Sequence, residues 1–310
     1  MTRRLPASAV DLLDARVELD VHAGDAPLTP DEMRARVGDK EALIVLLSDR
    51  VDRAVIDSAP ALKVIANVAV GFDNIDVAHA VSRGVVVTNT PDVLTDAVAD
   101  LTWALILAVT RRIGEGERIL RGGGWRGWSF EFMLGSSLAG KQLGIIGPGR
   151  IGLAVGARAA AFGMSVAYAS RRPVDWAGAE AMSFDRLLAT SDVLSLHVPL
   201  LPETRHLIDQ RALARMKRTA YLVNTTRGAV VDEAALVWAL RERLIAGAAL
   251  DVFEREPEVH PGLLERENAV LTPHLGSATR ETRLGMAELA ARNVVAVLGG
   301  QPPLTPVRPR

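Results

Sequence analysis

Short apolar runs alternate with amphipathic segments along the first third of the chain. β-branched and apolar residues dominate four runs, and each predicts a strand: residues 17–21, 42–47, 62–67 and 85–88. The segments between them predict short helices at residues 31–37, 52–58 and 76–82. Strands that alternate with helices in this way are typical of an α/β domain with a parallel sheet.

The same alternation returns in the second half, after a long helix predicted over residues 96–113 with Thr95 as its N-cap. That helix is apolar on nearly all faces, which predicts burial between domains or between subunits. Further strands are predicted at residues 141–146, 164–169, 192–198, 220–224, 247–252 and 269–272. A last helix is predicted over residues 281–298, and the proline-rich tail 301–310 is expected to be extended.

The length of 310 residues favours about two domains. We therefore expect an α/β fold with two Rossmann-like or flavodoxin-like parallel-sheet domains and a cleft between them. Residues 96–279 are expected to form one of these domains. Residues 1–95 together with 280–310 are expected to form the other.

A glycine-rich turn between a predicted strand and a predicted helix indicates a dinucleotide site. Gly147, Gly149 and Gly152 stand between the apolar strand 141–146 and an alanine-rich helix. Glycines at such positions allow a tight turn and let backbone amides at a helix N-terminus approach a pyrophosphate. The same pattern also occurs where a glycine turn only packs a helix on a sheet.

The end of the following strand indicates which dinucleotide binds. An NAD site carries Asp or Glu about 20 residues past the glycines to hold the ribose 2′-hydroxyl, but this chain has Ser170, Arg171 and Arg172 there. A hydroxyl and two guanidiniums suit a 2′-phosphate, which a carboxylate would repel. NADPH is therefore the expected cofactor and NADH a weaker one, although a solvated basic turn would have the same sequence.

Composition excludes several other classes of protein. The chain is 49% hydrophobic and 24% charged with a net charge of −1, so no overall field favours nucleic acid or an acidic membrane. It contains no cysteine, which excludes disulfides and thiolate chemistry and fits a reducing compartment. Without an apolar run long enough for a membrane span or signal peptide, a cytoplasmic location is expected. The histidine spacing predicts no metal site.

Three polar residues follow predicted strands of the second series. Arg227, Glu256 and His274 each come just after a strand, where cofactor and substrate meet in this type of sheet. Reduction of a carbonyl needs a proton donor and a cation for any carboxylate, which a histidine and an arginine supply. Each residue type taken singly is also common in structural roles. The segment His197, Val198 and Pro199 ends another strand and is expected to line the cofactor groove.

Six segments give the chain a strong resemblance to the D-isomer-specific 2-hydroxyacid dehydrogenase family. They run in family order over almost the whole chain: VGFDNID (70–76), VTNTPDVLTDAVAD (87–100), GIIGPGRIG (144–152), NTTRGAVVDEAAL (224–236), ALDVFEREP (249–257) and LTPHLGSAT (271–279). Within the family, these segments are similar to the corresponding segments of NADPH-dependent glyoxylate/hydroxypyruvate reductases and of hydroxyphenylpyruvate reductases.

The resemblance implies a catalytic triad of Arg227, Glu256 and His274 that reduces a small 2-oxoacid to the D-2-hydroxyacid. It also implies that residues 96–279 are the dinucleotide-binding domain and that residues 1–95 with 280–310 are the substrate-binding domain. It further implies a homodimer paired through the nucleotide domains, in which Trp125 or Trp128 could reach the partner's active site. The remaining implied contacts are to the substrate carboxylate at Val70 and Gly71, and to the cofactor at Arg150, Ile151, Thr226, Asp251 and Gly276.

Other functions share this fold and stay open at this point. An aryl-pyruvate reductase and a phosphoglycerate-type dehydrogenase would use the same residues on a different 2-oxoacid. Formate enzymes of the superfamily carry glutamine where Glu256 stands, so Glu256 favours hydroxyacids. A dinucleotide-sensing corepressor of this fold can retain all three triad residues, and only the absence of 2-oxoacid reduction would indicate it.

Overall fold

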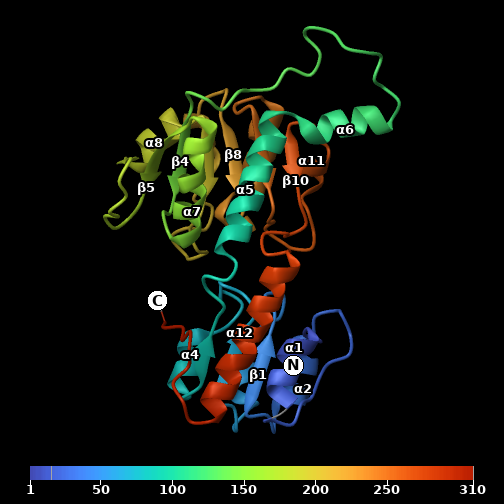
Figure 1. Cartoon of the computed structure of the whole chain (residues 1–310), viewed down its shortest axis with the longest axis vertical. Helices are drawn as coiled ribbons and strands as arrows, with labels where there is room; N and C mark the ends of the chain where they lie inside the picture. Colours follow the sequence, from blue (N-terminus) through green and yellow to red (C-terminus); the bar gives the residue numbers. More distant parts are fainter. Residues whose placement is uncertain (15, 310) are drawn as a thin grey trace. The chain divides into compact units, whose positions relative to one another are not determined.

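The computed structural model describes residues 1–14 and 16–309, and Arg310 at the end of the predicted extended tail lies outside them. The chain divides into two compact units, Met1–Leu94 with Ala278–Arg310, and Thr95–Ser277. Each unit is an α/β layer structure with its own parallel sheet (Figure 1). The predicted α/β fold class is therefore confirmed. No helix in the described part of the chain is long and apolar enough to cross a bilayer.

The first unit contains a three-stranded parallel sheet in the order β1-β2-β3. Its strands are β1 (Ala42–Val45), β2 (Val64–Asn67) and β3 (Val86–Thr88). Its helices are α1 (Ala7–Asp14), α2 (Pro30–Val37), α3 (Arg53–Asp57), α4 (Val77–Ser82) and α12 (Arg280–Leu298). Alternate strand residues point to opposite faces, so Ile44 and Val64 pack with α1 and α12, whereas Val45 and Ile65 pack with α2, α3 and α4.

The second unit contains a seven-stranded parallel sheet in the order β10-β9-β8-β7-β4-β5-β6. Its strands are β4 (Gln142–Ile146), β5 (Ser165–Ala169), β6 (Ala179–Ala181), β7 (Val193–Leu196), β8 (Tyr221–Asn224), β9 (Gly247–Leu250) and β10 (Ala269–Leu271). Its α-helices are α5 (Thr95–Thr110), α6 (Ile113–Arg121), α7 (Arg150–Ala159), α8 (Phe184–Thr190), α9 (Gln210–Arg215), α10 (Glu233–Arg241) and α11 (Pro261–Leu264). Two 3₁₀ turns are η1 (Ala160–Phe162) and η2 (Gly228–Val230).

The two faces of this larger sheet bury different helices. Leu143 and Ile145 of β4 pack in one cluster with residues of α5 and α7. Leu194 and Leu196 of β7 pack in the opposite cluster with residues of α8, α9 and α10. Figure 1 shows α5 and α7 in front of the sheet, while α6 and the chain after it extend away from it. Because every pair in the sheet is parallel, the turns that follow β4, β5 and β7 to β10 lie along one edge.

Several predicted elements differ from the structure at their ends by one or two residues, and two differ more, one in type and one in extent. Residues 17–21 are not a strand; Val17 and Leu19 pack as partly buried side chains on the α1–α12 cluster. The predicted helix 96–113 ends at Thr110, because Arg112 adopts a left-handed conformation (φ 54°) before α6 starts in a new direction. Thr95 is the first residue of α5 rather than a residue that precedes it.

His197, directly after β7, makes the stability of this sheet dependent on pH. Its Nε2 lies 2.8 Å from Ser195 Oγ, and burial lowers the pKa of His197 to about 3. An unfolded histidine takes up a proton below a pH of about 6.5, whereas folded His197 stays neutral until about pH 3. Since the unfolded chain then binds more protons, the free energy of unfolding should fall as the pH is lowered through this window.

Replacement His197→Asn should remove this contribution. Urea titrations of both proteins at several pH values between 7.5 and 4.5 measure it. The wild type should lose more stability than the variant as pH falls, by at most about 1.4 kcal/mol per pH unit for one group. Stability curves that run parallel over the whole range would contradict an imidazole that stays neutral in the folded chain.

Candidate active site

The turn between β4 and α7 has the shape that a dinucleotide phosphate requires. Gly147 has φ 86°, and a Cβ there would lie 2.7 Å from Val198 Cγ1 and 2.8 Å from the His197 carbonyl oxygen. A Cβ on Gly152 would lie 2.6 Å from the Gly147 carbonyl oxygen, whereas the space beside Gly149 is open. Two glycines are thus required by close packing, and the third leaves room above the turn.

The amides that this turn offers are those at the start of α7. Gly149 N–H donates to the Gly147 carbonyl within the turn (2.8 Å), so that amide is already used. Arg150 and Ile151 are the first residues of the helix, so their N–H groups face its N-terminal end and the turn. A pyrophosphate placed there would meet backbone donors and the positive end of the helix dipole.

The basic turn after β5 is exposed, and one of its arginines has a partner that the sequence did not indicate. Ser170, Arg171 and Arg172 are all solvent-exposed. Arg171 Nη1 lies 2.6 Å from Glu203 Oε1, on the segment that follows β7. Glu203 is more than thirty residues away in sequence, and no local pattern marks it as a partner.

The turns after β7 and β8 are joined to each other. Thr226 Oγ1 donates to the Val198 carbonyl, which ties the segment of His197, Val198 and Pro199 to the turn that carries Arg227. Asn224 at the end of β8 holds this turn on both sides, since its Oδ1 accepts from Thr226 N (3.1 Å) and its Nδ2 donates to the Arg227 carbonyl (2.9 Å). The Arg227 backbone is therefore fixed by the strand that precedes it.

Glu256 and His274 are in direct side-chain contact. His274 Nδ1 lies 2.7 Å from Glu256 Oε2, and Phe253 N–H donates to Glu256 Oε1 (3.0 Å). The side chains are 31% and 35% exposed, so the pair is open to a small molecule. Burial raises the pKa of Glu256, but the hydrogen bond and charge of His274, the Phe253 amide and the Arg227 charge outweigh it and hold that pKa below its ordinary value.

Asp251 fixes the backbone around His274. Its carboxylate, 1% exposed, accepts hydrogen bonds from Thr272 Oγ1 (2.6 Å), Leu275 N (2.7 Å) and Gly276 N (2.8 Å). His274 N–H donates to the Asp251 carbonyl (2.9 Å), and His274 itself has φ 53°. A left-handed conformation is uncommon for a residue other than glycine and persists where its surroundings determine it. These contacts were not indicated by the sequence, and the expected contact of Asp251 with the nicotinamide stays a prediction.

Val70 and Gly71 belong to the first unit, between β2 and α4. The Val70 carbonyl accepts from Asn89 Nδ2 (2.8 Å) and the Gly71 carbonyl from Asn67 Nδ2 (2.7 Å). The loop is therefore held through its carbonyl groups by two asparagines. Its expected role in binding a substrate carboxylate stays a prediction.

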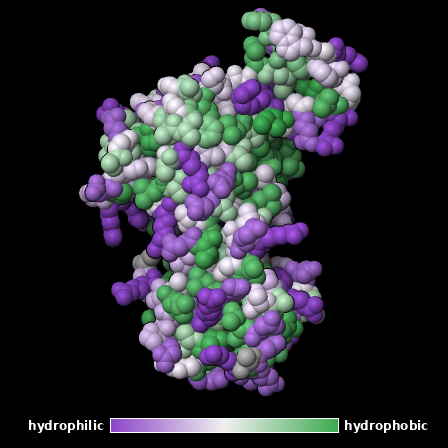
Figure 2. Space-filling model, viewed as in Figure 1, coloured by the Kyte–Doolittle hydropathy of each residue, from purple (hydrophilic) through white to green (hydrophobic). Residues whose placement is uncertain are grey.

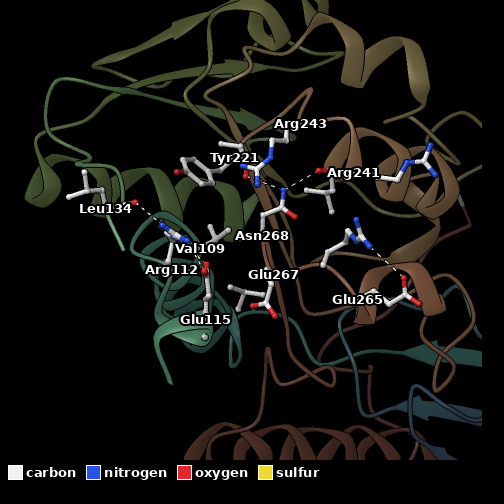
Figure 3. A pocket seen from close by; sticks show the side chains of 15 residues that line it. Val109, Arg112, Glu115, Leu134, Tyr221, Arg241, Arg243, Glu265, Glu267 and Asn268 are labelled. Atoms are coloured by element: carbon white, nitrogen blue, oxygen red, sulfur yellow. Dashed lines mark hydrogen bonds and ion pairs between the residues drawn. The ribbon is translucent and has the colours of Figure 1, made fainter. Parts of the chain in front are cut away.

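A separate cavity of about 560 Å³ lies at the amino ends of the strands, at the opposite edge of the sheet from Arg227, Glu256 and His274. Figure 3 shows its charged walls. Arg112 pairs with Glu115 (2.6 Å), and Arg266 lies 3.5 Å from Glu265. None of the predicted site residues lines this cavity. No group of three or more potential metal ligands occurs among residues 1–14 and 16–309.

Comparison with known proteins gives consistent results over the whole chain. Residues 103–276 match the family described as D-isomer specific 2-hydroxyacid dehydrogenase, NAD binding domain. The chain is 47% identical to a glyoxylate reductase of Thermococcus litoralis, over 98% of this chain and 94% of the relative.

Two solved structures extend the similarity to the fold. A protein of Thermus thermophilus is 48% identical with a TM-score of 0.94, over 99% of this chain and 98% of that one. An NADPH-dependent glyoxylate/hydroxypyruvate reductase of Sinorhizobium meliloti, in complex with NADP and malonate, is 36% identical with a TM-score of 0.90, over 99% and 97%. The chain belongs to the D-isomer specific 2-hydroxyacid dehydrogenase family.

Proposed function

We propose that this protein reduces a small 2-oxoacid of the glyoxylate or hydroxypyruvate type to the D-2-hydroxyacid, with NADPH as the preferred cofactor. The observation that carries the proposal is the hydrogen-bonded pair of His274 and Glu256, with the Arg227 charge acting on the same carboxylate. The pair lies on the strand edge that also holds the glycine turn. The similarity to glyoxylate reductases over nearly the full length supports the substrate class.

The three side chains suit distinct steps of a carbonyl reduction. Arg227 binds the substrate carboxylate and polarises the keto oxygen. A carboxylate only accepts hydrogen bonds, so the proton between Glu256 and His274 is assigned to His274 Nδ1. Nε2 is then the nitrogen that donates a proton to the keto oxygen, while Glu256 stabilises the charged imidazolium.

The residues present fit a nicotinamide dinucleotide. The phosphate cradle would be the turn of Gly147, Gly149 and Gly152, where a side chain at Gly147 or Gly152 would collide with neighbouring backbone and the space beside Gly149 is open. Ser170, Arg171 and Arg172 would hold the 2′-phosphate. When bound, the cofactor supplies the hydride that adds to the carbonyl carbon, while the proton from His274 goes to the oxygen.

Removal of the proton donor should affect turnover far more than cofactor binding. In His274→Ala, kcat for glyoxylate reduction should fall by about 10²- to 10⁴-fold, the usual contribution of a general acid. The dissociation constant of NADPH, measured by fluorescence titration, should stay within about twofold. Retained turnover would remove His274 from this role.

The pH profile tests the part assigned to Glu256. Reduction should decline as pH rises, because the donor must carry its proton. In Glu256→Gln the neutral amide no longer stabilises the imidazolium, so the decline in kcat/KM should begin at a lower pH than in the wild type. An alkaline limb that does not move would show that the pair does not act in this way.

The exposed ion pair of Arg171 and Glu203 allows two variants, one expected to weaken NADPH binding and one expected to strengthen it. Arg171→Ala should weaken NADPH binding by about 10- to 150-fold, because a charge-assisted bond contributes about 1.5–3 kcal/mol. Glu203→Gln should strengthen NADPH binding only modestly, by up to about fivefold, since an exposed and solvent-screened ion pair competes weakly for Arg171. Neither change should alter NADH binding. Equal or better kcat/KM with NADH in the wild type would contradict the preference.

A homodimer is part of the proposal, and α6 with the chain after it is the surface expected to form it. Trp128 is 84% exposed and Phe130 is 81% exposed. Other exposed apolar residues in this segment are Ile113, Leu120, Trp125, Phe132 and Leu134. Figure 2 shows green apolar atoms among polar ones on this projecting segment. Large apolar side chains gathered on one exposed segment, rather than scattered singly, are typical of association sites in proteins.

Light scattering coupled to gel filtration tests the dimer. The wild type should elute with twice the chain mass of 33.2 kDa. The double variant Trp128→Glu, Phe130→Glu should elute as a monomer, because charge on both aromatic positions opposes their burial. Leu264→Glu is the matched control, since Leu264 is 66% exposed on α11, outside this segment. A double variant that remains dimeric would contradict the assigned surface.

A further inference from the structure

Two glutamates next to the candidate active site bind each other's backbone. Glu233 N–H donates to Glu254 Oε1 (2.9 Å), and Glu254 N–H donates to Glu233 Oε1 (2.7 Å). Glu233 begins α10 and is 7% exposed, and the Glu254 side chain is 18% exposed. The two hydrogen bonds are reciprocal, so they fix two segments that are far apart in sequence against each other.

These two segments are the ones that carry Arg227 and Glu256. The first runs from Arg227 through η2 to Glu233, and the second runs from Phe253 to Glu256. Their backbones touch, because a Cβ on Gly228 would lie 1.8 Å from the Phe253 carbonyl carbon and 2.3 Å from Glu254 N. The hydrogen bonds between Glu233 and Glu254 therefore join these two segments close to the place where their backbones touch.

A third segment, the connection between β7 and α9, contacts both Glu254 and the segment that carries Arg227. His206 Nε2 lies 3.0 Å from Glu254 Oε2, Arg205 Nη2 lies 3.8 Å from the same oxygen, and His206 N–H donates to the Ala229 carbonyl (2.8 Å). Both residues belong to the connection between β7 and α9, which begins with His197. Glu254 thus uses one oxygen for the Arg227 segment and the other for the β7 connection.

The electrostatics show how two carboxylates can lie side by side here. Burial raises the pKa of Glu233, and the nearby Glu254 charge raises it further against the backbone hydrogen bonds and His260. Burial also raises the pKa of Glu254, but the Glu233 amide, His206 and Arg205 outweigh it and hold that pKa below its ordinary value. The pKa values of the two carboxyls are thus shifted in opposite directions.

We propose that Glu233 and Glu254 are positioning residues that set the separation between the Arg227 guanidinium and the Glu256–His274 pair. The proposal rests on the proposed function, because it assigns these glutamates to the same reaction. Small displacements of reacting groups, of about 1 Å, can cost about 10²-fold in rate. The pair touches neither substrate nor cofactor in this proposal, so its loss should appear in turnover rather than in cofactor affinity.

The test compares Glu254→Ala, Glu254→Asp and Glu254→Gln by steady-state kinetics with glyoxylate and NADPH. Glu254→Ala should lower kcat by about 10- to 100-fold, with NADPH affinity within about twofold of the wild type. Glu254→Gln keeps an oxygen that accepts from Glu233 N–H, so it should restore most of kcat. Glu254→Asp keeps the charge but shortens the side chain, so its kcat should be lower than that of Glu254→Gln.

Glu258→Ala is the matched control, because Glu258 is an exposed glutamate on the same loop. Its kcat should equal that of the wild type. If Glu254→Ala does not fold, the order of the aspartate and glutamine variants decides the question. Wild-type kcat in Glu254→Asp, or a loss in Glu254→Gln as large as in Glu254→Asp, would overturn the positioning role. A wild type without 2-oxoacid reduction would instead contradict the proposed function.

Discussion

The hydrogen bond between His274 and Glu256 depends on the parallel register of β8, β9 and β10. Asn224 pairs with Leu250, and Leu250 pairs with Leu271, so three strands end at the same level. The residues after them, including Arg227, Glu256 and His274, are thereby brought to one edge of the sheet. The backbone pairing of the strands therefore determines where these three residues lie, and side-chain contacts then hold the turns that carry them.

Carboxylates that are buried or partly buried then hold the turns that follow these strands. Asp251 holds the turn around His274 through three hydrogen bonds to its side chain. Glu233 and Glu254 link the segments that carry Arg227 and Glu256. Buried charge costs free energy unless it is hydrogen-bonded, and these carboxylates bind mainly backbone amides of the turns they support. Rigid turns of this kind keep a site in place before a ligand binds.

Much of this arrangement could be predicted because it is local in sequence. The apolar runs of β4, β7, β8 and β9 predict buried parallel strands, and glycines between a strand and a helix predict a phosphate turn. Residues 17–21 misled this reasoning, because alternating Val, Glu, Leu and Asp also suits an irregular segment with one face on a core. The end of the helix before Arg112 could not be predicted either, because neither Arg112 nor the residue before it is a glycine or proline that would mark a left-handed turn.

Contacts between distant turns could not be predicted from one sequence. Nothing near Arg171 indicates Glu203, and nothing near Glu254 indicates that its partners are Glu233 and His206. Such pairs depend on which turns meet in the folded sheet, and a charged residue in a loop is more often simply solvated. The resemblance implies roles for Arg227, Glu256 and His274, but it does not indicate the contacts that Glu233 and Glu254 make.

The most direct measurement is a crystal structure of the protein with NADP and oxamate, a non-reducible analogue of a small 2-oxoacid. The account predicts that the analogue's carbonyl oxygen accepts a hydrogen bond from His274 Nε2 at about 2.6–3.2 Å, with its carboxylate on Arg227 and the Glu256–His274 pair intact. An analogue bound at another place, or a His274 ring turned away from it, would contradict the account.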